Sequence, residues 1–119
     1  MPMLSSVLLV DDDPAFLILA ARILDGIGVE RVVPAQDAAA AVAAANATRP
    51  EGALVDVGLP DRDGIDLARE LVALPWRPRV VLTSSDKDAA SAIDARDGVP
   101  FVPKEDLTMG RLSQLLTRE

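Results

Sequence analysis

The sequence predicts an α/β domain in which a parallel five-stranded sheet is covered by helices on both faces. Apolar runs of strand length alternate with helical patterns from one end of the chain to the other. The runs Val7–Val10 and Val80–Leu82 are apolar at every position rather than at every second one, which is typical of parallel strands buried on both faces. A chain of 119 residues, 50% of them hydrophobic, can build one core but not two, so residues 1–119 are expected to form one domain.

Five strand–helix units follow one another in order. The expected strands are Val7–Val10, Val32–Val33, Ala53–Val57, Arg79–Leu82 and Val99–Val102. The expected helices are Pro14–Leu24, Ala38–Ala47, Ile65–Leu74, Ala89–Ala95 and Leu107–Leu116. A helix between consecutive strands is the connection that parallel neighbours require.

Capping and stop signals between the units support these boundaries. Asp13 precedes Pro14, which is an N-cap followed by proline at the first helical position. Asp37 and Asp63 are expected to cap the second and third helices. The pair Arg49–Pro50 should end the second helix, because the residue before proline is disfavoured in the helical conformation.

The composition excludes several classes of function. The net charge is −7 and no cluster of Lys and Arg occurs, so direct binding of nucleic acid by this domain is not expected. Three aromatic residues, Phe16, Trp76 and Phe101, are too few to build a stacking platform for bases. Cys and His are absent, so any metal must be a hard cation held by oxygen ligands.

We expect neither a membrane-spanning segment nor an export signal in this sequence. No stretch reaches the ~20 apolar residues that cross a bilayer. The N-terminus lacks the basic, apolar and cleavage-site pattern of a secretory signal. We therefore expect a cytoplasmic protein without membrane contact.

Charged and hydroxyl side chains follow four of the expected strands, at the edge where open α/β sheets bind ligands. They are Asp11 to Asp13 after the first strand, Asp56 in the third, Thr83 to Ser85 after the fourth and Lys104 after the fifth. A lone carboxylate is costly to bury in an apolar strand, so a cation or hydrogen-bond donors are expected beside Asp56. On spacing alone, Asp56 is equally a structural ion-pair partner of Lys104 or a reactive group.

Carboxylates that converge in one crevice repel one another, and a divalent cation relieves that repulsion. Mg²⁺ fits best, because it prefers octahedral oxygen ligands and combines one or two carboxylates with phosphate oxygens. A carboxylate beside such a cation can act as a nucleophile toward phosphorus and form an aspartyl phosphate. A lysine and a threonine hydroxyl would stabilise the added charge.

Four segments resemble the motifs of the receiver domains of two-component response regulators, in the family's order and spacing. They are VLLVDDDP at 7–14, ALVDVGLPDRDG at 53–64, VVLTSSD at 80–86 and FVPK at 101–104. Each motif is weak alone, but four of them at the ends of four strands make a specific combination that covers nearly the whole chain. The resemblance implies a flavodoxin-like (βα)5 fold with the strand order 2-1-3-4-5.

The resemblance also implies roles for the acidic residues. Asp56 would accept the phosphoryl group. Asp11 and Asp12 would organise Mg²⁺ together with Asp56, with Asp12 preferred over Asp11 as the direct ligand. The backbone carbonyl of Gly58 would complete the protein's share of the coordination.

A second set of implied roles concerns activation and switching. Thr83 would hydrogen-bond the phosphoryl group and Lys104 would form an ion pair with it. Phe101 matches the aromatic position whose rotamer follows Thr83. The signal would then appear on the surface made by the expected helix Ala89–Ala95, the fifth strand and the last helix, where a homodimer could also form.

The implied function is that of a signalling phosphoacceptor and not of an enzyme, although the domain would assist its own phosphorylation and dephosphorylation. The donor would be a sensor histidine kinase or a phosphotransfer protein. One alternative is a small Mg²⁺-dependent phosphohydrolase with an Asp nucleophile, although nothing resembles the Asp-x-Asp pair expected on its first strand. Another is an interaction module that keeps the fold and is never phosphorylated. The chain fits either a stand-alone receiver or part of a longer regulator.

The sequence departs from the family pattern around the lysine. Glu105 follows Lys104 where many members have proline, so a cis peptide bond after the lysine is not expected. Pro103 precedes the lysine and lacks a backbone donor, which suits the end of an edge strand.

Overall fold

The computed structural model describes residues 3–86 and 98–117. Within these residues five strands form one sheet, and all their pairings are parallel. The strands are β1 (Ser6–Val10), β2 (Arg31–Ala35), β3 (Gly52–Asp56), β4 (Arg79–Ser84) and β5 (Phe101–Pro103). Their order in the sheet is β2-β1-β3-β4-β5, so the expected fold class and strand order are confirmed.

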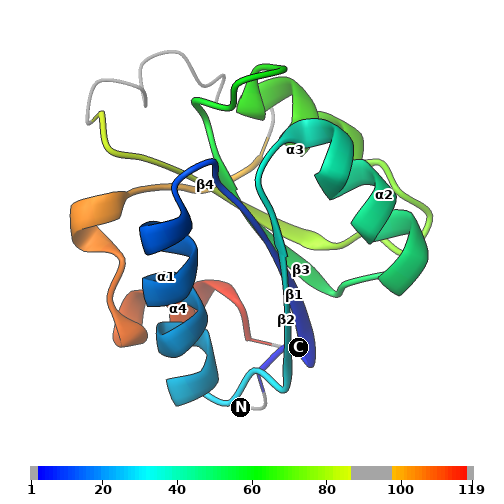
Figure 1. The fold of residues 1–119 in the computed structure, drawn as a ribbon. Coiled ribbons are helices and arrows are strands. Elements are labelled where there is room, and N and C mark those ends of the chain that lie inside the picture. Colours follow the sequence, from blue (N-terminus) through cyan, green and yellow to red (C-terminus); the bar gives the residue numbers. More distant parts are fainter. Residues whose placement is uncertain (1–2, 87–97, 118–119) are drawn as a thin grey trace.

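Helices cover both faces of this sheet (Figure 1). Helices α1 (Pro14–Gly26) and α4 (Met109–Leu115) pack on one face, and α2 (Ala38–Thr48) and α3 (Gly64–Val72) pack on the other. A 3-10 turn, η3 (Lys104–Asp106), connects β5 with α4. The predicted helix Ala89–Ala95 lies outside the described residues, so α4 corresponds to the last predicted helix, Leu107–Leu116.

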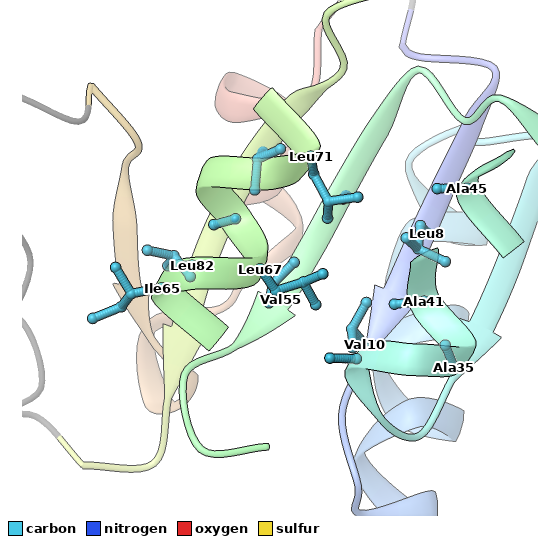
Figure 2. Packing of buried hydrophobic residues seen from close by; sticks show 14 residues of the cluster. Leu8, Val10, Ala35, Ala41, Ala45, Val55, Ile65, Leu67, Leu71 and Leu82 are labelled. Carbon is cyan, nitrogen blue, oxygen red and sulfur yellow. The ribbon is translucent and has the colours of Figure 1, made fainter. Parts of the chain in front are cut away.

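The core beneath α2 and α3 combines small and large side chains (Figure 2). Helix α2 turns Ala38, Ala41 and Ala45 toward the sheet, and these short side chains let its backbone approach β1 and β2 closely. Helix α3 fills the space over β3 and β4 with Leu67 and Leu71. The alanines of α2 therefore serve two purposes: they favour the helical conformation, and they allow the helix to pack closely on the sheet.

The core beneath α1 and α4 is built from larger side chains. Leu17 and Leu24 of α1 are buried there with Leu112 and Leu116 from the C-terminal segment. Leu115, the last residue of α4, is only partly buried. No helix in the described part of the chain is long and apolar enough to cross a bilayer.

The three predicted N-cap residues are confirmed, although α3 begins one residue earlier than predicted, at Gly64, and α4 two residues later, at Met109. The side chains of Asp13, Asp37 and Asp63 accept hydrogen bonds from backbone N–H groups in the first turns of α1, α2 and α3. Arg49 ends α2 in the left-handed conformation, with φ of 47°. Strand β3 ends at Asp56, one residue before the predicted end at Val57, because the chain turns there into the loop that leads to α3.

Gly64, the first residue of α3, packs directly against the end of β3. A Cβ atom at this position would lie 2.1 Å from the carbonyl oxygen of Asp56 and 2.7 Å from the Cα of Val57. The N–H of Gly64 donates to the carbonyl of Val57 at 2.9 Å, which closes the loop between them. The close approach therefore fixes the backbone of Asp56 and requires glycine at the start of α3.

We predict that Gly64→Ala lowers the free energy of unfolding by about 3 kcal/mol, because the new methyl group overlaps backbone atoms that cannot rotate away. Urea denaturation followed by circular dichroism measures the change. Gly110→Ala in α4 is the matched control, since a Cβ at Gly110 meets no atom within 4 Å. That variant should be neutral or more stable by roughly 0.5–1 kcal/mol. Equal stability of Gly64→Ala and wild type would contradict the close packing.

Candidate functional site

Two buried aspartates meet at the carboxyl edge of the sheet, between β1 and β3. Asp11 directly follows β1 and Asp56 is the last residue of β3. The two strands are neighbours, and the chain leaves β1 toward the α1 face and β3 toward the α3 face. This is the topological switch point, where open α/β sheets form a crevice between loops that diverge.

Asp11 is almost completely buried, with 1% of its surface exposed. Its Oδ1 accepts a hydrogen bond of 2.9 Å from the N–H of Asp13, the N-cap of α1. Its Oδ2 lies 2.7 Å from Nζ of Lys104, yet no donor in the described residues meets hydrogen-bond geometry at this oxygen. The ion pair compensates the charge of the carboxylate and leaves the lone pairs of Oδ2 without an aligned hydrogen bond.

Asp12 is exposed and joins the two buried aspartates at the mouth of the crevice. Oxygens of Asp11, Asp12 and Asp56 all lie within 4.8 Å of one another. Carboxylates at this spacing, one with a buried oxygen that lacks a hydrogen-bond donor, fit a hard divalent cation that takes oxygen ligands. The structure thus brings together the three acidic residues predicted to form the metal site.

The environment of Asp56 disfavours its negative charge. Burial raises the pKa of this carboxyl above its ordinary value, and the neighbouring charge of Asp11 raises it further. The ammonium of Lys104 and the backbone N–H of Gly58 act in the opposite direction, but they do not cancel the rise in pKa. A cation that entered the crevice would stabilise the negative charge of Asp56 and lower this pKa.

Lys104 follows the edge strand β5 and reaches the site across β4. Its Nζ is closer to Asp11, at 2.7 Å, than to Asp56, at 3.8 Å. The same ammonium lies 4.2 Å from the centre of the Phe16 ring, within the range of a cation–π contact. Sequence reasoning considered Asp56 as the structural partner of the lysine and did not identify Phe16. The described residues contain no cis peptide bond, so the bond after Lys104 is trans, as expected.

Thr83 sits beside Asp56 in the sheet, since the two residues are partners in the β3–β4 register. Its side chain is buried, and its hydroxyl donates a 2.7 Å hydrogen bond to the carbonyl of Val102 in β5. Phe101, the preceding residue of β5, is partly buried and packs against the core under α2 and α3. In this structure the hydroxyl of Thr83 therefore belongs to the β4–β5 pairing.

The loop from β3 to α3 carries Gly58, which is exposed. A Cβ atom there would meet no atom within 4 Å, so the space above the backbone is open. An isolated bridge pairs Gly58 with Asp63, the N-cap of α3. The loop is thus held at its base while the region near the acidic crevice stays accessible.

Asp61 has a role that sequence reasoning did not find. Its two carboxylate oxygens accept hydrogen bonds of 2.9 and 3.0 Å from the N–H groups of Ala38 and Ala39. These bonds lower the pKa of the Asp61 carboxyl. The first turn of α2 is therefore capped both by Asp37 and by a residue from the β3–α3 loop, and this ties that loop to α2.

Comparisons with known proteins agree on one family. A family model described as the response regulator receiver domain matches residues 7–109. The DNA-binding response regulator MtrA of Mycolicibacterium smegmatis is 33% identical over 105 residues, which cover 83% of this chain and 46% of MtrA. The KDP operon transcriptional regulatory protein KdpE of Escherichia coli is 33% identical over 94 residues, which cover 77% of this chain and 41% of KdpE.

Solved structures give the same result. The BeF3-activated N-terminal receiver domain of RstA from Klebsiella pneumoniae matches with a TM-score of 0.80 and 26% identity, covering 95% of this chain and 99% of that one. NtrX from Brucella abortus matches with a TM-score of 0.80 and 29% identity, covering 98% of this chain and 27% of that one.

The doubly wound sheet and the carboxylates at its switch point define an α/β domain organised around an acidic crevice. The chain belongs to the response regulator receiver domain family, which serves two-component signalling. It spans less than half the length of the curated relatives MtrA and KdpE. The comparisons do not favour either a phosphohydrolase or an interaction module that is never phosphorylated.

We predict that Asp56→Asn stabilises the metal-free domain at pH 7. A carboxyl whose pKa is raised by folding favours the native state while it is protonated and opposes that state once it ionises, so removing the charge helps above its folded-state pKa. The melting temperature should rise by a few degrees, the shift that about 1 kcal/mol gives a domain of this size.

The advantage of Asp56→Asn should shrink as the pH falls through the raised folded-state pKa of Asp56 and vanish below the ordinary carboxyl value of 3.8, where Asp56 is neutral in both states. Thermal unfolding in EDTA across this pH range measures it. Glu30→Gln makes the same change of charge at an exposed position and should leave the melting temperature nearly unchanged. An Asp56→Asn variant that melts below wild type at pH 7 would show that the carboxylate is stabilising.

Proposed function

We propose that this receiver domain accepts a phosphoryl group on Asp56 and binds Mg²⁺ through Asp11, Asp12, Asp56 and the backbone carbonyl of Gly58. The observation that carries the proposal is the meeting of three carboxylates within 4.8 Å at the switch point of the sheet. The buried Oδ2 of Asp11, without an aligned hydrogen bond, adds support. When bound, Mg²⁺ would supply positive charge that neutralises the carboxylates and the phosphoryl oxygens.

In the proposed transfer, a carboxylate oxygen of Asp56 attacks the phosphorus of a phosphohistidine. The new O–P bond forms while the N–P bond of the donor breaks, and the electron pair returns to the imidazole nitrogen, which takes up a proton from solvent. The open space over Gly58 leaves room for the donor to approach.

Lys104 and Thr83 are proposed to stabilise the phosphoryl group. Nζ of Lys104 lies 3.8 Å from Asp56 Oδ2, so a small movement of this side chain would bring it to an added phosphoryl oxygen. Thr83 is the register partner of Asp56, but its hydroxyl would first have to leave the carbonyl of Val102. Both residues would thus exchange a present partner for the phosphoryl group.

Loss of the Thr83–Val102 bond would be the first step of the switch. A hydroxyl drawn toward Asp56 leaves space beside β4, and Phe101 would turn inward to fill it. The change would alter the surface made by β5, α4 and the segment 89–95, of which the last lies outside the described residues. A partner or a second copy of the domain that prefers this state would bind more tightly after phosphorylation.

The remaining expectations are part of the same proposal. The donor would be a sensor histidine kinase or a phosphotransfer protein, and residues 1–119 would form the whole receiver domain. The domain would act in the cytoplasm, would not bind nucleic acid itself, and would assist its own phosphorylation without being an enzyme.

We predict that Mg²⁺ with a small phosphodonor such as acetyl phosphate modifies Asp56 and no other residue. Intact mass and peptide mapping identify the modified residue, and Asp56→Asn should abolish the modification. Asp12→Ala should weaken Mg²⁺ binding by roughly tenfold or more. Removing a residue that only hydrogen-bonds a metal ligand already lowers metal affinity by about tenfold, and Asp12 is proposed to be a ligand itself. If Asp56→Asn is phosphorylated to the same extent as wild type, Asp56 is not the phosphoacceptor.

We predict that Thr83→Val separates phosphorylation from the switch. Valine keeps the β-branched shape but cannot donate to a phosphoryl group, so beryllofluoride should still bind at Asp56 while the distant changes are lost. Chemical shifts of residues 98–117 with and without beryllofluoride measure this, and Thr83→Ser, which keeps the hydroxyl, is the control. Distant changes of full size in Thr83→Val would show that the hydroxyl does not connect the two regions.

A further inference from the structure

The ammonium of Lys104 has three neighbours that belong to three different elements. Oδ2 of Asp11 lies 2.7 Å away, Oδ2 of Asp56 lies 3.8 Å away, and the centre of the Phe16 ring lies 4.2 Å away. Only 19% of the lysine side chain is exposed, so water screens these interactions weakly. The ammonium therefore sits between the Asp11 carboxylate and an aromatic face, beyond hydrogen-bond distance of Asp56.

The positions of the ring and the lysine are fixed independently. Phe16 lies in the first turn of α1, whose N-cap Asp13 donates its backbone N–H to Asp11 Oδ1 and accepts from the N–H of Ala15. The ring is partly buried against the core under α1 and α4. Lys104 enters from the other side, as the first residue of η3 directly after β5.

A cation over an aromatic face gains roughly 0.5–2 kcal/mol, more when the pair is shielded from water. An aliphatic side chain at this position would offer no comparable attraction to the ammonium. Because Asp11 and Asp56 both attract Lys104, a preference of this size is enough to decide which carboxylate the lysine contacts. In the metal-free structure the ammonium lies over the Phe16 ring and is closer to Asp11 than to Asp56.

We propose that Phe16 is a positioning residue that holds Lys104 against Asp11 in the metal-free domain, so that the lysine and a divalent cation compete for the same carboxylate. The competition rests on the proposed metal-binding function, whereas the placement of Lys104 does not. Asp11 Oδ2 is both the nearest partner of the ammonium and a buried oxygen without an aligned hydrogen bond.

Two consequences follow from this arrangement. The ammonium of Lys104 lies 2.7 Å from Asp11, so a cation that binds beside Asp11 repels it. Displacing the ammonium breaks its contact with Phe16, and the free energy of that contact therefore opposes metal binding. A lysine displaced from Asp11 has Asp56 as its other acidic neighbour, which is where the phosphoryl charge is proposed to form. Phe16 would thus lower the affinity for the metal and make the release of Lys104 depend on metal binding.

The placement is tested by NMR of the metal-free protein, because protons above a ring face are shifted upfield. The ε-CH2 protons of Lys104 should resonate upfield in wild type and in Phe16→Tyr, which keeps the ring, and near their ordinary position in Phe16→Leu. Mg²⁺ should reduce the upfield shift in wild type. An ε-CH2 signal that is the same in wild type and Phe16→Leu would overturn the placement.

The competition is tested by Mg²⁺ titration calorimetry in a double-mutant cycle. Phe16→Leu should bind Mg²⁺ about two- to fivefold more tightly than wild type, and Phe16→Tyr should bind it like wild type. In a Lys104→Gln background Phe16→Leu should have no effect, because no ammonium remains over the ring. An equal effect in both backgrounds would show that Phe16 acts through packing, and the proposal would be wrong.

The same titrations separate this proposal from the proposed function. A wild-type domain that binds no Mg²⁺ would overturn both the metal site and the competition. The NMR comparison of wild type with Phe16→Leu would still decide whether the ring places the lysine. Normal Mg²⁺ binding with no change in Phe16→Leu would leave the metal site intact and reject only the role of Phe16.

Discussion

The repulsion between two buried carboxylates is the constraint on which the rest of the site depends. The strand order makes β1 and β3 neighbours, so Asp11 and Asp56 end side by side at the carboxyl edge of the sheet. Both are buried, and the negative charge of Asp11 helps to raise the pKa of Asp56. The cost is reduced in the metal-free state by Lys104, which is delivered from β5 on the opposite side of β4.

Rigid loop ends keep these charges in place against their own repulsion. Asp13 ties the start of α1 to Asp11, and Gly64 lets α3 begin in contact with the backbone of Asp56. Asp61 ties the loop that carries Gly58 to the first turn of α2. The acidic residues that cap the helices next to the crevice thus also fix the loops that surround it. Because these carboxylates accept hydrogen bonds from backbone N–H groups, the loops around the crevice are held in place in the metal-free structure.

Much of this arrangement could be predicted from the sequence, for identifiable physical reasons. Continuous apolar runs separated by capping residues specify parallel strands and intervening helices, and an Asp inside an apolar strand marks Asp56 as exceptional. The strand order came from the family resemblance, since local patterns carry no information on which strands pair. Asp61 was missed because capping rules look within one turn, whereas its partners Ala38 and Ala39 are 23 and 22 residues away. The preference of Lys104 for Asp11 depends on side-chain geometry at η3, which no spacing rule encodes.

The short edge strand connects the acidic crevice with the rest of the domain. Strand β5 has three residues, pairs only with β4 among the described strands, and ends in a proline without an N–H donor. The Thr83–Val102 hydrogen bond adds to the short backbone pairing that holds β5 on β4, and Lys104 follows β5 directly. Any ligand that attracts both the Thr83 hydroxyl and the Lys104 ammonium acts on the middle residue of β5 and on the residue that follows the strand. A change of charge at Asp56 would shift the balance of contacts at β5 more easily than at β1 or β3, which are paired on both sides.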